Sequence, residues 1–162
     1  MVISKFYNNT EEQIKDKNDH LRIMMDFLRT KKNPNILETT EFVVYGLFND
    51  YDDRYWDVPP TGDVFRQSLE LLIERLSGLS VLFILPAEDL PPTHYTGSGG
   101  VTLERVSEFN EVARSMISEK VDVLHLDSLI TSKEKESIDD VRHYPRDVWQ
   151  KVGQYTVNWF SI

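Results

Sequence analysis

Short apolar runs alternate with longer amphipathic stretches along most of this chain. Three runs rich in β-branched, aromatic and leucine side chains are typical of strands buried in a parallel sheet, and they lie at Phe42–Leu47, Val81–Leu85 and Val121–Leu126. Three stretches with apolar residues at three- and four-residue spacing predict helices, and they cover 61–76, 103–117 and 145–159. Thr61 can cap the first helix, and Pro145 stands where a first helical residue often lies.

The order of these elements is strand, loop, helix, repeated three times. Such alternation predicts right-handed crossovers and a mostly parallel sheet with helices on both sides. Ligands of these sheets bind at the carboxyl ends of the strands. Long polar loops follow residues 47, 85 and 126, and all of them leave from that edge. We therefore expect a site built from Asn49, the loop 88–100 and the pair Asp140 and His143.

Residues 1–38 differ from the rest of the chain because they are mostly polar. Their clearest apolar pattern has a three- to four-residue spacing that favours a short helix, and it consists of Leu21, Met24, Met25 and Leu28. We expect residues 1–38 to form a polar lead-in with this helix. Residues 39–162 are expected to form a single α/β domain.

The amino-acid composition limits the kinds of molecule that the protein is expected to bind and the chemistry that it can carry out. The chain has 162 residues, with 27 acidic and 18 basic side chains and a net charge of -9. That balance disfavours nucleic acid, since proteins that bind it cluster lysine and arginine. No apolar run approaches the roughly 20 residues of a membrane span, and Met1–Lys5 turns polar too soon for a signal peptide. The absence of cysteine excludes disulfides and thiolate chemistry and leans toward a reducing compartment such as the cytoplasm.

The segment Asp140–Pro145 carries the clearest candidate chemistry. Asp140 precedes His143 by three residues, just ahead of the last predicted helix. An imidazole with an adjacent carboxylate can take a proton from a nucleophile while the carboxylate orients the ring. The alternative is a loop histidine beside a helix whose N-terminus Asp140 stabilises. Asp139 could replace Asp140 in either role.

Asn49 follows the first predicted strand, where its amide could donate a hydrogen bond to a developing oxyanion. A plain turn is the alternative, because asparagine is favoured there. The glycines of 97–100 lack the lysine of a phosphate-binding loop and favour a flexible loop. His94, His125 and His143 match no standard zinc spacing, so we expect neither a metal nor a cofactor.

Two further motifs, Tyr-Trp-Asp at 55–57 and Phe-Arg-x-x-Leu at 65–69, and the strand sequence Val-Asp-Val-Leu-His-Leu-Asp at 121–127 lie between Asn49 and His143. Together with the segments of Asn49 and His143, and in this order, they resemble the SGNH hydrolase superfamily (GDSL esterases), and within it the PC-esterase-like branch. The resemblance covers roughly residues 40–160. It rests on five motifs, namely Gly-x-x-Asn-Asp at 46–50, Tyr-Trp-Asp at 55–57, Phe-Arg-x-x-Leu at 65–69, Val-Asp-Val-Leu-His-Leu-Asp at 121–127 and Asp-x-x-His-Tyr-Pro at 140–145.

The resemblance implies a three-layer α/β/α sandwich of flavodoxin-like type and metal-free ester hydrolysis by a Ser-His-Asp triad. It makes His143 the base, Asp140 its partner and Asn49 an oxyanion donor, acting on a small-molecule or glycan ester. Two departures stand out. One extra residue separates Gly46 from Asn49, and the family's Gly-Asp-Ser nucleophile motif is missing, with Ser4 the only serine before residue 40.

Three interpretations follow from the missing serine. In the first, the chain is an acyl-esterase domain that is truncated or degenerate, and in the truncated case its nucleophile lies on sequence outside this chain. Alternatively, it is a non-catalytic SGNH-like module that binds or scaffolds. Outside the family, a generic flavodoxin-like interaction domain has the same order of elements.

Overall fold

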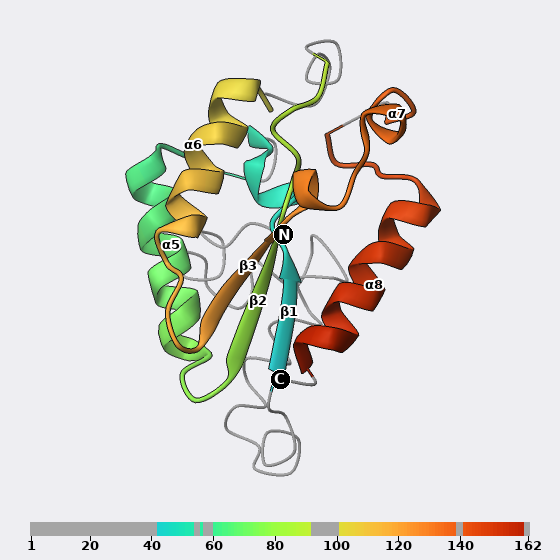
Figure 1. Cartoon of the computed structure of the whole chain (residues 1–162). Coiled ribbons are helices and arrows are strands. Elements are labelled where there is room, and N and C mark those ends of the chain that lie inside the picture. The colour runs from blue at the N-terminus through green and yellow to red at the C-terminus, as the bar shows by residue number, and fades with distance from the viewer. Residues whose placement is uncertain (1–41, 54–55, 57–59, 92–100, 139–140, 161–162) are drawn as a thin grey trace, which may run out of the picture.

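The computed structural model describes residues 42–53, 56, 60–91, 101–138 and 141–160 (Figure 1). Three strands form a parallel sheet in the order β1–β2–β3, and they are β1 (Phe42–Gly46), β2 (Ser80–Leu85) and β3 (Val121–His125). The structure confirms the α/β class and the parallel strands predicted from the sequence. The predicted division at residue 38 lies outside the described residues.

Helices lie on both sides of this sheet (Figure 1). The longer ones are α5 (Gly62–Arg75), α6 (Leu103–Arg114) and α8 (Arg146–Phe160). α5 and α6 lie together on one side, whereas α8 lies on the other (Figure 1). The hydroxyls of Thr61 and Thr102 cap α5 and α6 by accepting hydrogen bonds from backbone N–H groups of the first helical turn.

The core is densest around the central strand. Residues 81–85 of β2 are all buried, as expected for a strand with a neighbour on each side and helices above and below. β1 differs from the expectation of burial on both faces, since Phe42 is 37% exposed and Val44 38% exposed. Among the described residues β1 pairs only with β2, so it is an edge strand of the three-stranded sheet that these residues form.

The chain turns sharply where β1 ends. A Cβ atom on Gly46 would lie only 2.6 Å from Cε2 of Phe48, so the ring of Phe48 occupies the space that a larger residue would fill. This ring packs against Tyr144 and against Trp149 of α8, at centroid distances of 5.8 and 5.6 Å. The missing side chain at Gly46 thus lets the segment after β1 contact the start of α8.

Short helices interrupt two of the predicted loops. They are η1 (Asn49–Tyr51) after β1, η4 (Leu126–Ser128) after β3, and α7 (Ser132–Lys135). α7 begins with a capping box, in which the Thr131 hydroxyl accepts from the backbone of Glu134 while the Glu134 carboxylate accepts from the backbone of Thr131. In the described ranges we find no helix both long and apolar enough to cross a bilayer.

Candidate functional site

The segments that follow the three strands gather at the carboxyl edge of the sheet (Figure 1). η1 follows β1, the segment 86–91 follows β2, and η4 follows β3. The chain returns to this edge just before α8, in the residues around His143 (Figure 1). The sequence-predicted residues Asn49 and His143 both belong to these segments.

His143 is an exposed residue between two anchored neighbours. Arg142 forms an ion pair with Asp52, whose side chain is completely buried. On the other side, the hydroxyl oxygen of Tyr144 accepts a hydrogen bond of 2.8 Å from the backbone N–H of Ala87. The backbone that carries His143 is therefore attached to the segments after both β1 and β2.

Asn49, like His143, is an exposed residue between two neighbours that are anchored in the domain. It is exposed, and it lies between Phe48, which packs against the start of α8, and the completely buried Asp50. The Asp50 carboxylate accepts a hydrogen bond of 3.2 Å from the Tyr45 hydroxyl, and the indole N–H of Trp56 donates to the Asp50 carbonyl at 2.8 Å. Burial, together with the charge of Asp50, raises the pKa of Tyr45 well above its ordinary value.

The segments that carry Asn49 and His143 contact each other through the neighbours of both residues. Phe48 packs against Tyr144, and Asp52 pairs with Arg142. Asn49 and His143 thus belong to two adjoining segments. Asp140, the third predicted site residue, lies outside the described residues, as do Asp139, His94 and the glycines of 97–100.

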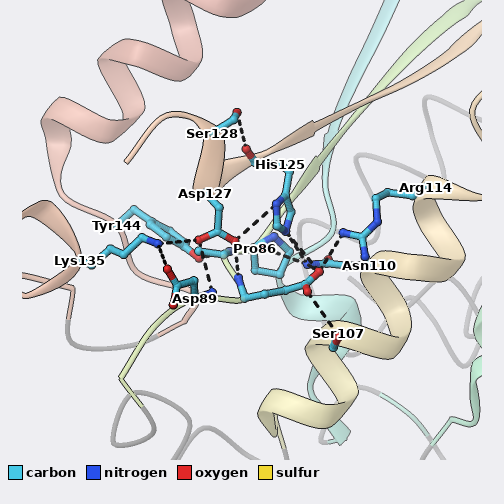
Figure 2. A network of polar contacts seen from close by, with 12 residues as sticks. Pro86, Asp89, Ser107, Asn110, Arg114, His125, Asp127, Ser128, Lys135 and Tyr144 are labelled. Carbon is cyan, nitrogen blue, oxygen red and sulfur yellow. Dashed lines mark hydrogen bonds and ion pairs between the residues drawn. The ribbon is translucent and has the colours of Figure 1, made fainter. Parts of the chain in front are cut away.

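A second polar cluster lies beside these segments, between β2, β3 and α6 (Figure 2). Its centre is Asn110, which is completely buried. The Asn110 amide nitrogen lies 2.9 Å from Glu88 Oε1, 3.0 Å from the Pro86 carbonyl oxygen and 3.0 Å from His125 Nε2. The Asn110 carbonyl oxygen accepts a hydrogen bond of 2.6 Å from the Tyr51 hydroxyl, which connects this cluster to η1.

Asp127 completes the cluster on the side of α7 (Figure 2). Its carboxylate accepts hydrogen bonds from the backbone N–H groups of Glu88 and Asp89, at 2.7 and 3.4 Å. Lys135 Nζ lies 3.2 Å from the same carboxylate, and His125 Nδ1 lies 3.4 Å from it. The Asp127 carboxylate therefore holds the backbone of the segment that follows β2.

The two titratable groups at the centre of the cluster have shifted pKa values. Burial lowers the pKa of His125, although the carboxylates of Asp127 and Glu88 oppose that shift. Burial disfavours the Glu88 carboxylate, but hydrogen bonds from Arg114 and Asn110 outweigh it and lower the Glu88 pKa. Both ring nitrogens of His125 lie within 3.4 Å of protein polar atoms, so the arrangement holds the ring in place.

The chain matches no protein-family model, no curated protein and no solved structure. Within the described residues, no group of three or more histidine, aspartate or glutamate side chains is arranged to hold a metal ion.

Sequence reasoning did not find the Asn110 cluster, although one signal was present. Asn110 lies four residues after Val106 and three before Ala113, so it occupies the apolar face of a predicted helix. A polar residue at such a position needs buried partners. Those partners could not be named, because Glu88 and His125 come from different strand ends.

Proposed function

We propose that residues 39–162 are an SGNH-like acyl-esterase domain of the three-layer α/β/α type, with its site at Asn49 and His143. The observation that carries this proposal is the contact between Phe48 and Tyr144, whose ring centroids are 5.8 Å apart. Each ring belongs to the direct neighbour of one site residue. The parallel sheet with helices on both sides also agrees with such a fold.

In this proposal His143 accepts the proton of a serine hydroxyl as that hydroxyl attacks an ester or acetyl carbonyl, and it returns the proton to the alcohol that leaves when the ester bond breaks. Water then releases the acid from the acyl-serine, with His143 again as the base. The Asn49 amide donates a hydrogen bond to the carbonyl oxygen as it becomes negatively charged. Asp140 orients the imidazole. Substrates are small-molecule or glycan esters. The reaction needs a serine, and the chain has no Gly-Asp-Ser motif.

That missing motif favours a second candidate function, a module of the same fold that binds esters without hydrolysing them. Two serines of the neighbouring polar cluster donate hydrogen bonds to other groups (Figure 2). The Ser128 hydroxyl donates to the His125 carbonyl oxygen at 2.7 Å, and the Ser107 hydroxyl donates to Glu88 at 3.4 Å.

Hydrolysis of p-nitrophenyl acetate separates these functions. Under the esterase proposal, His143→Ala lowers turnover by roughly 100-fold or more, because general base catalysis contributes at least that factor. Asn49→Ala lowers turnover by a similar factor through loss of an oxyanion donor. Asn158→Ala is the matched control, since Asn158 lies on the exposed part of α8. Turnover that survives His143→Ala contradicts the esterase proposal.

The binding module predicts a different pair of results. The parent chain does not turn over p-nitrophenyl acetate but binds the unreactive amide analogue p-nitroacetanilide saturably, and His143→Ala abolishes this binding. A parent chain that neither hydrolyses the ester nor binds the amide contradicts both functions.

A further inference from the structure

We propose that Arg142 and Asp52 are positioning residues that hold the backbone of His143 against the segment of Asn49. This inference rests on the proposed function, because it concerns the same site. It adds a role for an ion pair whose charged side chains take no part in the proposed chemistry. The experiment that tests it needs no catalytic activity.

The pair joins distant parts of the sequence at one point. Arg142 Nη1 contacts Asp52 Oδ2, and 90 residues separate the two in the chain. Asp52 is completely buried, and the Arg142 side chain is 12% exposed. An ion pair removed from water to this extent is held far more rigidly than a surface pair, because neither charge can leave its partner without a large desolvation cost.

The ion pair of Arg142 and Asp52 holds the backbone of His143, because Arg142 is the residue directly before it. Arg142 and Tyr144 flank His143, and the side chains of both are anchored to the body of the domain. The side chain between them is exposed. Two anchored neighbours leave the backbone of His143 little freedom, while His143 itself stays exposed.

Asp52 is equally well placed on the other segment. Its backbone N–H donates to the Asn49 carbonyl oxygen at 3.2 Å and closes the turn of η1. The same residue therefore fixes the turn of Asn49 through its backbone and the segment of His143 through its side chain. A displacement of Asp52 moves both site segments together.

A neighbouring ion pair supplies a matched control. Arg105 pairs with Asp53, one residue beyond Asp52, and this pair is also partly buried. It attaches the same segment to α6, and the Arg105 guanidinium also interacts electrostatically with Asp52. Loss of Arg105 removes these interactions but leaves the contact between Arg142 and Asp52 in place, so we expect it not to release His143.

The test is the backbone order parameter of His143, measured by ¹⁵N relaxation in the full chain. We expect Arg142→Met to lower it from the rigid range of about 0.85 to below about 0.6, and Arg105→Met to leave it rigid. Arg142→Lys, which keeps the charge, restores most of the order. If Arg142→Met does not fold, Arg142→Met combined with Asp52→Asn removes both charges of the pair and takes its place.

Equal order at His143 in the Arg142→Met and Arg105→Met variants overturns the inference, whether both stay rigid or both become mobile. Failure of the proposed function looks different. In that case the parent chain shows neither turnover nor binding, yet the order parameter of His143 still depends on Arg142.

Discussion

The rings of Phe48 and Tyr144 pack against each other with their centroids 5.8 Å apart. Phe48 follows β1, whereas Tyr144 comes from the other end of the domain, just before α8. The Tyr144 hydroxyl also accepts a hydrogen bond from the backbone of Ala87, after β2. One side chain therefore ties together three segments at the carboxyl edge of the sheet. The aromatic contact exists because Gly46 leaves room for the Phe48 ring.

Gly46→Ala tests this dependence. The new Cβ would lie 2.6 Å from the Phe48 ring, so the ring must move. We expect the free energy of unfolding to fall by about 1–3 kcal/mol, the usual cost of overpacking. Urea denaturation measures it. Gly153→Ala in α8 is the control, because nothing lies within 4 Å of its new Cβ. That change should raise stability by about 0.5–1 kcal/mol. Equal effects of the two substitutions contradict this account of Gly46.

Asn110→Leu tests the buried cluster. The change preserves approximate size but leaves the Tyr51 hydroxyl and the Pro86 carbonyl oxygen without their Asn110 partner. We expect a loss of about 2 kcal/mol or more in the free energy of unfolding, because each buried polar group left unsatisfied costs about 1–3 kcal/mol. Asn158→Leu on exposed α8 serves as the control and should change stability by less than about 0.5 kcal/mol. A loss no larger than that of the control would show that the cluster adds little to stability.

The same cluster predicts how stability depends on pH. Burial lowers the pKa of His125, so the unfolded chain takes up this proton at a higher pH than the folded one. Stability therefore falls as the pH drops below about 6.5, by at most about 1.4 kcal/mol per pH unit. The pKa of Glu88 is also lowered, and its contribution is lost below its ordinary value of 4.5.

The free energy of unfolding is measured for the parent chain and for His125→Gln between pH 7 and 4. This comparison separates the pH range of His125 from that of Glu88. The variant should lose the slope near pH 6 and keep the slope below pH 4.5. An unchanged slope near pH 6 would show that another group, not His125, controls stability in that range.

The sequence predicted the strands and the long helices well because their patterns are local. Thr61 caps α5 as expected, and the buried run Val81–Leu85 forms β2. The exposure of Phe42 and Val44 was not foreseen, since an apolar run does not reveal whether its strand lies at the edge of the sheet. α7 was missed although Thr131 and Glu134 carry the spacing of a capping box.

The site was predictable to a smaller extent. Sequence order placed Asn49 and His143 at the carboxyl edge of the sheet, and the structure puts their segments in contact. The burial of Asp50 and Asp52 could not be predicted, because aspartates after a strand usually indicate a turn. The partner of Asp52 lies 90 residues away, a distance over which no local pattern carries information.

The central claim is that Asn49 and His143 belong to one site, and an NMR titration tests it most directly. p-Nitroacetanilide is added to the labelled chain while the Asn49 side-chain amide and the His143 ring are observed. We predict that both resonances shift with the same apparent dissociation constant, and that the side-chain amide of Asn158 does not move. Different constants for Asn49 and His143, or a shift of only one of them, would contradict a shared site.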